Sequence, residues 1–257
     1  MTDSILFAVN DGLAHITLNR PARLNAINDD AAHAWLDIAR QVSDRDDIRA
    51  VLVDAAGPAF CAGGDVAEMS AMDGETSATI GELADIIHEG HQILTATPKP
   101  IVAAVQGAVA GGGLGFMLVA DYIVASENAR FVSKYADIGL TPDCGVSTLL
   151  PEAVGLRRAL QLTLSDTSLT AAEALDWGLI TEVTPPGETD ARARAVADRW
   201  LTGATAAFGQ AKRLLRSGVH RELRASYDDE ARTIAAAAGT DDARARIAAF
   251  VARSARR

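Results

Sequence analysis

The chain has 257 residues, 49% of them hydrophobic, with a net charge of −10 and a pI of about 4.9. This length supports one large domain, or one domain with a helical appendage. The negative charge disfavours a nucleic-acid partner, because such proteins usually carry a basic stripe.

The cysteines and the apolar runs indicate the cellular location that we expect for the protein. Cys61 and Cys144 lie far apart, so we expect no disulfide framework and a reducing, cytoplasmic location. Residues 1–20 lack the charged start and apolar core of a signal peptide. Asp121 or glycines break the longest apolar runs, so we expect no membrane span and no membrane partner.

Strands and helices are predicted in alternation along the first part of the chain. Two alternating runs flank Asn-Asp-Gly, which is a hairpin signal. The expected strands lie at residues 5–9, 13–19, 49–55, 101–107 and 121–126, and at the start of 129–145. Helices are expected over 29–42, with Asp29 as its N-cap, and over 79–96.

The rest of the chain is predicted to be mostly helical from about Leu150, apart from a short strand at 179–183. Strand, glycine turn and helix recur several times before that helical tail. This pattern predicts an α/β fold with a glycine turn at the end of each strand. Ligands in such sheets bind beyond the carboxyl ends of the strands.

Two glycine-rich turns carry the first functional signal. Residues 109–115 read Val-Ala-Gly-Gly-Gly-Leu-Gly, and residues 59–65 read Ala-Phe-Cys-Ala-Gly-Gly-Asp. The first matches neither of the phosphate-binding motifs GxGxxG and GxxxxGK[ST]. Two alternatives remain: close helix packing, or backbone N–H groups that converge as an oxyanion hole.

Four segments in order resemble the enoyl-CoA hydratase/isomerase, or crotonase, superfamily. They read NRPARLNAIN, AFCAGGDVAEM, KPIVAAVQGAVAGGGLG and LTAAEALDWGLITEV. The resemblance implies a crotonase-like spiral of repeated ββα units over residues 1–200, and a C-terminal helical region for oligomerisation over 201–257. It also implies acyl-CoA thioester substrates, no further cofactor, and assembly into a homotrimer or a hexamer made of two trimers.

Motif positions of that family carry over to residues of this chain. The two N–H groups that stabilise the thioester enolate would belong to Gly64 and Gly112. The positions that contact CoA correspond to Arg23, Leu24, Ala26, Ala62, Asp65 and Val66. Pocket walls are expected from Met69, Leu83, Ile87, Phe116, Tyr135 and Leu140. The residues alone leave Arg23 open as a solvated arginine and Asp65 as a helix N-cap.

The catalytic positions differ from those of the family's hydratases. Those enzymes split water with two glutamates, whose positions hold Gly115 and Tyr135 here. A tyrosine with an ordinary pKa near 10 is a poor base at neutral pH. Asp143 remains, and it matches the single aspartate base of ring-1,2-epoxyphenylacetyl-CoA isomerases and Δ3,Δ2-enoyl-CoA isomerases. The local sequence also allows Asp143 to be only a helix N-cap.

His88 supports a rival chemistry. It matches the histidine with which 4-chlorobenzoyl-CoA dehalogenases hydrolyse an aryl-aspartate ester, and their nucleophile matches Asp143. His88 and His91 lack the i, i+4 spacing of the zinc motif, so no metal is expected. We therefore expect an acyl-CoA isomerase with Asp143 as its base. The alternatives are a hydratase, a dehalogenase-like hydrolase, and an acyl-CoA-binding protein without turnover.

Overall fold

The computed structural model describes residues 3–71 and 76–254. Its main sheet has the strand order β1-β2-β3-β4-β6-β9, in which only the β1–β2 pair is antiparallel. Those strands are β1 Ile5–Asn10, β2 Leu13–Leu18, β3 Ala50–Ala55, β4 Ile101–Val105, β6 Tyr122–Ser126 and β9 Glu182–Thr184. A smaller sheet, in the order β5-β7-β8, consists of β5 Ala108–Ala110, β7 Arg130–Val132 and β8 Ser168–Thr170.

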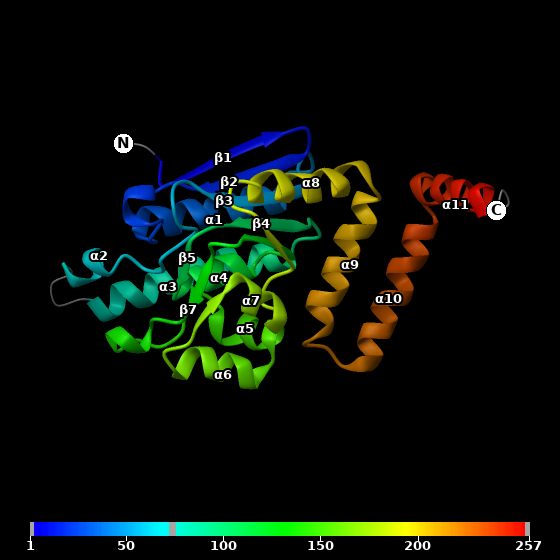
Figure 1. The fold of residues 1–257 in the computed structure, drawn as a ribbon. Helices are drawn as coiled ribbons and strands as arrows, with labels where there is room; N and C mark the ends of the chain where they lie inside the picture. The colour runs from blue at the N-terminus through cyan, green and yellow to red at the C-terminus, as the bar shows by residue number, and fades with distance from the viewer. Residues whose placement is uncertain (1–2, 72–75, 255–257) are drawn as a thin grey trace.

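Helices cover both faces of the main sheet. The helices of the body are α1 Asp29–Asp44, α2 Val66–Ser70, α3 Thr76–Ala96, α4 Gly112–Leu118, α5 Val146–Val154, α6 Leu156–Leu164, α7 Ala171–Trp177 and α8 Thr189–Thr202. Strand β3 shows how the layers arise, because its side chains alternate between the two faces. Val51 and Val53 belong to the core with α1 and α3, whereas Leu52 packs with Val196 of α8. Helix α8 packs on β3 and β4, and Figure 1 shows α3 below these strands.

The predicted α/β class is confirmed, with differences at element boundaries. The hairpin forms, and Asp11 and Gly12 at its turn have φ of +52° and +89°. The helix predicted over 29–42 continues to Asp44, and its N-cap is Asn28 rather than Asp29, because Asn28 Oδ1 accepts from the N–H of Ala31. The helix predicted over 79–96 begins at Thr76. Strands of three residues, such as β5 and β8, are too short for a sequence period to reveal.

The unit that positions the site is a long strand, a short strand and then a helix. Strands β4 and β5 lead into α4, and β6 and β7 lead through a loop to α5. That loop contains the 3-10 helix η2 Ala136–Ile138, and η1 Pro21–Arg23 follows β2. An isolated parallel bridge pairs Cys61 with Val109 of β5. The chain after Cys61 and the chain after Val109 therefore run side by side.

Helices α9 Thr205–Gly218, α10 Leu223–Ala238 and α11 Asp241–Ser254 end the chain and extend to the right in Figure 1. Neither α10 nor α11 contains a buried residue. In the part of the chain that the structure describes, no helix combines the length and apolar character needed to cross a bilayer.

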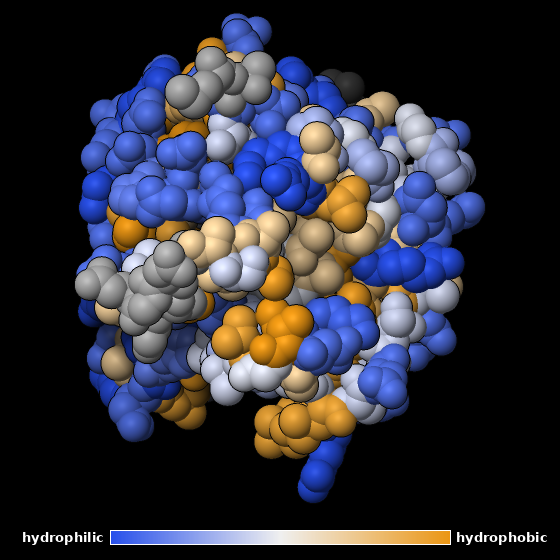
Figure 2. All heavy atoms as spheres, turned by 90° about the vertical axis from the view of Figure 1, so that its left-hand side faces the viewer, coloured by the Kyte–Doolittle hydropathy of each residue, from blue (hydrophilic) through white to orange (hydrophobic). Residues whose placement is uncertain are grey.

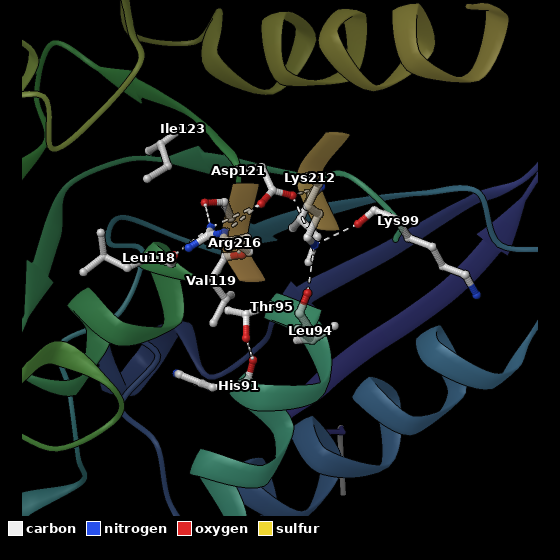
Figure 3. A network of polar contacts seen from close by, with 12 residues as sticks. His91, Leu94, Thr95, Lys99, Leu118, Val119, Asp121, Ile123, Lys212 and Arg216 are labelled. Atoms are coloured by element: carbon white, nitrogen blue, oxygen red, sulfur yellow. Dashed lines mark hydrogen bonds and ion pairs between the residues drawn. The ribbon is translucent and has the colours of Figure 1, made fainter. Parts of the chain in front are cut away.

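A buried polar network fastens α9 to the body (Figure 3). The ammonium of Lys212 lies 3.1 Å from Oδ2 of Asp121 and donates to the carbonyl oxygens of Leu94 and Lys99 at 2.8 and 2.9 Å. Arg216 donates to Oδ1 of Asp121 at 3.2 Å and to the carbonyl of Ala120 at 2.9 Å. Burial lowers the pKa of Lys212 to about 8, against the opposing charge of Asp121.

Candidate active site

A cavity of about 430 Å³ opens beside α2, the first half of α3 and the loop after β7. Figure 2 shows that face of the molecule, where apolar surface gathers near the centre among hydrophilic side chains. Most of the side chains around the cavity are aliphatic. The lining residues are Ile27, Ala62, Gly63, Gly64, Val66, Met69, Ile80, Gly81, Leu83, Ala84, Ile87, Gly111, Gly112, Lys134, Tyr135, Asp137, Ile138, Leu140, Thr141, Asp143 and Cys144.

The two glycine turns meet at this cavity. Gly64 follows Cys61 by three residues and Gly112 follows Val109 by three, so the parallel bridge between Cys61 and Val109 brings them alongside each other. The approach is close: a Cβ added to Gly63 would lie 3.3 Å from the nitrogen of Gly112. The structure therefore brings together the turns that the sequence could only place at the ends of separate strands.

Both turns offer an N–H group. Gly112 is the first residue of α4, and the first N–H groups of a helix have no carbonyl partner within it. The bridge of Ile27 with the 63–65 turn uses the carbonyl of Gly63 and the N–H of Asp65, so the N–H of Gly64 takes no part in it. Two such donors at one cavity can stabilise a developing oxyanion.

Asp143 lies next to the Gly112 turn. Its Oδ1 would be 3.6 Å from a Cβ placed on Gly112, and it accepts a hydrogen bond of 2.6 Å from the hydroxyl of Tyr135. Burial, and then the charge of Asp143, raise the pKa of the Tyr135 phenol far above its usual value. Burial likewise raises the pKa of the neighbouring Cys144 thiol. Asp143 thus faces neutral donors.

The other lining carboxylate, Asp137, has a cationic partner. Its Oδ2 lies 2.6 Å from the ammonium of Lys134, three residues earlier. Both side chains are about half exposed, so this pair sits at the rim of the cavity. Among residues 3–71 and 76–254, no group of three His, Cys, Asp or Glu side chains is arranged to hold a metal ion.

Gly115 occupies the position of the first hydratase glutamate, and the structure has no room for a side chain there. A Cβ at Gly115 would lie 1.9 Å from the carbonyl oxygen of Cys144 and 2.8 Å from its Cβ. Real Cβ atoms essentially never approach a backbone oxygen that closely, so the loop of Asp143 and Cys144 occupies the space of any side chain there. Tyr135 at the second position is the donor to Asp143.

Residues assigned to the CoA end lie beside the same turn. The N–H of Ala62 donates to the carbonyl of Leu24 at 3.0 Å, and the side chains of Arg23 and Leu24 are exposed. Ala26 is buried. Of these residues, Ala62 lines the cavity, whereas Arg23, Leu24 and Ala26 are not among the lining residues.

Asp65 caps α2 and forms an ion pair. Its side chain accepts from the N–H of Glu68 at 3.3 Å, and Oδ2 lies 2.9 Å from Arg20. Burial would raise the pKa of this carboxyl, but its hydrogen bonds to Arg20 and Glu68 outweigh burial and lower it. Both the cap and the ion pair hold the Gly64 turn in place, whereas Val66, the next residue, lines the cavity.

Two expected site residues lie elsewhere. Phe116 is fully buried and packs against the rings of Trp35 and His91, at centroid distances of 4.7 and 4.8 Å, so it belongs to the core and not to the pocket wall. His88 is on the exposed side of α3 and does not line the cavity. The geometric basis for His88 as a group that hydrolyses an ester on Asp143 is therefore absent.

Several lining residues were not expected from the sequence. Ile80 and Ala84 complete a stripe with Leu83 and Ile87 at the i, i+3, i+4 and i+7 positions of α3. That helical period was visible in the sequence and could have identified them. Ile138 and Thr141 lie in an irregular loop, where no period applies.

Comparison with known proteins agrees with this geometry. Residues 8–256 match the enoyl-CoA hydratase/isomerase family. The chain is 32% identical to 1,2-epoxyphenylacetyl-CoA isomerase of Escherichia coli over 98% of this chain and 97% of that protein. It is 33% identical to trans-2-decenoyl-[acyl-carrier-protein] isomerase of Streptococcus mutans over 77% and 74%. Relatives named as enoyl-CoA hydratases match over comparable lengths.

A solved structure supports the same relationship. The enoyl-CoA hydratase/isomerase of Cupriavidus metallidurans superimposes with a TM-score of 0.89 at 30% identity, covering 98% of this chain and 95% of that one. The chain belongs to the enoyl-CoA hydratase/isomerase family and has the predicted crotonase fold with C-terminal helices.

Proposed function

We propose that the protein is an acyl-CoA isomerase that moves a double bond by proton transfer through Asp143. The observation that carries this proposal is the placement of Asp143 beside the Gly112 turn, while Asp137, which also lines the cavity, is paired with Lys134. An isomerase needs a single base together with a site for the enolate oxygen.

The reaction follows from this arrangement. Asp143 takes a proton from the carbon next to the thioester carbonyl of a 3-enoyl thioester. The C–H electron pair forms the enolate C=C bond, and the carbonyl π electrons move onto the oxygen. The N–H groups of Gly64 and Gly112 hydrogen-bond that oxygen as its negative charge develops. Asp143 then returns the proton two carbons further along the chain, which yields the conjugated 2-enoyl thioester.

The surroundings of Asp143 favour isomerisation over its rivals. Hydration requires an acid and a base around one water, but the backbone of Cys144 fills the space at Gly115, and Tyr135 is directed at Asp143. A dehalogenase-like hydrolysis requires a base beside the ester, and His88 is exposed and is not among the residues that line the cavity. Among relatives, the names of the Escherichia coli and Streptococcus mutans proteins are those of isomerases.

The test compares Asp143→Asn with the wild type on 3-enoyl-CoA in deuterated water. The amide keeps the shape but cannot accept a proton, so isomerisation should fall by about 10²-fold or more while CoA-ester binding persists. Asp137→Asn, in the same loop, should retain most of the turnover because its carboxylate is bound to Lys134.

Three results would contradict the proposal. Rapid formation of 3-hydroxyacyl-CoA from a 2-enoyl-CoA, unchanged in Asp143→Asn, would favour a hydratase. A covalent ester on Asp143 would favour the hydrolase. Binding without turnover across a panel of acyl-CoA esters would favour a protein that only binds them.

The same panel addresses the acyl group. The cavity of about 430 Å³ is lined by aliphatic side chains, with Tyr135 as the aromatic residue among those identified in the described chain. We expect flexible 3-enoyl chains to be turned over, with the CoA portion lying across Arg23, Leu24 and Ala62. The free, buried thiols of Cys61 and Cys144 fit a cytoplasmic enzyme.

We further propose a homotrimer or a hexamer of two trimers, assembled through the C-terminal helices. The support is a set of large apolar side chains left exposed on α9, α10 and α11, and on the segment between α9 and α10: Leu215, Val219, Leu223, Tyr227, Ile234, Ile247, Phe250 and Val251. Apolar surface of this extent usually marks an interface. Sedimentation as a clean monomer at working concentration would contradict this assembly.

A further inference from the structure

The phenol of Tyr135 donates its hydrogen bond to Asp143. Its hydroxyl lies 2.6 Å from Oδ1 of Asp143 and 3.3 Å from the main-chain carbonyl oxygen of the same residue. The side chain is 8% exposed, and burial together with the charge of Asp143 raises its pKa far above the usual value. A phenol that stays protonated has one proton to donate, and the nearest acceptor is Oδ1.

The backbone fixes both ends of this contact. The carbonyl of Tyr135 accepts from the N–H groups of Ile138 and Leu140, at 3.2 and 2.9 Å, which closes the loop of η2. The carbonyl of Asp143 accepts from Val146 at 2.9 Å, which ties it to the start of α5. Cys144 holds a φ of +49°, an unusual conformation for a residue with a side chain.

We propose that Tyr135 is a positioning residue: it holds Oδ1 of Asp143 so that Oδ2 takes the proton from the substrate and returns it. This role rests on the proposed isomerase function. Oδ1 can accept the phenol's hydrogen bond whether or not Oδ2 is protonated. The carboxyl group therefore keeps one orientation through both proton transfers, and the same oxygen serves both carbons.

Other charged or titratable groups near Asp143 do not replace this donor. The ammonium of Lys134 is engaged by Asp137, and the Cys144 thiol stays protonated because burial raises its pKa. His91 of α3 lies near Gly145, two residues after Asp143. Burial lowers the pKa of His91 to about 3, so the imidazole is uncharged at neutral pH. The neutral phenol is thus the closest side-chain hydroxyl donor to the base.

The first experiment is Tyr135→Phe, which keeps the ring and removes the hydroxyl. The matched control is Tyr122→Phe, which removes a phenol that donates to Oε2 of Glu182 at 3.0 Å, outside the cavity. With 3-enoyl-CoA, kcat of Tyr135→Phe should fall about tenfold with KM little changed, the scale expected for losing one hydrogen bond to a charged group. Tyr122→Phe should leave both unchanged.

The split between kcat and KM distinguishes this role from a structural one. A ring that only fills the space beside Asp143 would leave kcat unchanged when its hydroxyl is removed.

The outcomes separate the two proposals. A wild type that does not isomerise 3-enoyl-CoA overturns the isomerase and this role together. A wild type that isomerises, with Tyr135→Phe unchanged in kcat, overturns the role of Tyr135 alone. If Tyr135→Phe binds CoA esters poorly, the double variant Tyr135→Phe, Asp143→Asn provides the test. Because Asp143 is already gone, loss of the hydroxyl should have little further effect on the residual turnover. A further loss as large as in the single variant would overturn the role of Tyr135.

Discussion

The two ends of the short helix α4 meet two different carboxylates. At its start, Gly112 lines the cavity next to Asp143, whose close partner is the neutral phenol of Tyr135. At its end, Arg216 donates to the last carbonyls while binding Asp121, which also pairs with Lys212.

The difference between the two carboxylates lies in their partners. Two cations hold Asp121, one on each oxygen, so its contribution is to structure. Asp143 has a donor that tolerates both of its protonation states. Acidic residues a few ångströms from the same helix can therefore serve catalysis or anchoring, and the partner's charge distinguishes them.

The largest effect is expected at the start of α4. Gly112→Pro removes the N–H, while proline is tolerated at the first position of a helix. Turnover should fall by about 10²- to 10³-fold, the scale of losing one oxyanion donor. Gly112→Ala is the control, since it keeps the N–H but adds a Cβ that would lie 3.0 Å from Sγ of Cys144. Equal activity of the two folded variants would show that this N–H is not used.

At the C-terminal end of α4, Asp121→Asn should lower the stability of the protein without lowering its turnover. The change leaves the buried ammonium of Lys212 without an anion, which costs about 3 kcal/mol. Urea unfolding measures the loss, and kcat of the folded variant should stay close to wild type. Asp143→Asn should instead lose turnover and keep its stability. A loss of turnover in both variants would contradict the division into a catalytic and a structural carboxylate.

The pH dependence of stability sharpens the comparison further. The pKa of Lys212 is about 8 in the folded protein and 10.5 in an unfolded chain. Between these values the unfolded chain holds more protons, so the wild type should gain stability with rising pH relative to Lys212→Met. Urea midpoints of both proteins at pH 7.5, 9 and 10.5 report this difference. A constant gap across the range would mean that Lys212 has an ordinary pKa.

The smallest effect is expected at His88. The side chain is exposed on α3, and such surface changes usually alter energies by about 0.5 kcal/mol or less. His88→Ala should therefore keep kcat within about twofold of wild type. Accumulation of an ester on Asp143 in this variant would contradict the assignment and restore the hydrolase rival.

Spacing along the chain singled out the glycine turns, whereas tertiary packing decides which other side chains reach the cavity. The resemblance pointed to Gly64, Gly112 and Asp143, and all three line one cavity. The bridge between Cys61 and Val109 explains why the two turns meet. His88 follows Ile80 and Ala84 at helical spacing, so the sequence period alone could not show that it is exposed and not among the lining residues.

The sequence alone could not show which of Phe116 and Tyr135 lies in the core and which lines the cavity. Both are aromatic residues near the glycine turns, yet one packs against Trp35 in the core and the other faces the cavity. That choice depends on how α1, α3 and α4 pack. The hydrogen bond between Tyr135 and Asp143 depends on the path of an irregular loop, for which the sequence carries no periodic signal.

The close approach at Gly115 has an evolutionary consequence. A glutamate introduced there would place its Cβ 1.9 Å from the carbonyl oxygen of Cys144, so a single substitution at this position cannot supply a catalytic carboxylate. The loop from Asp143 to Gly145 would first have to withdraw, and this would displace the proposed base. On the proposed function, descendants of this sequence that gain a glutamate at position 115 therefore pass through intermediates that have already lost isomerisation.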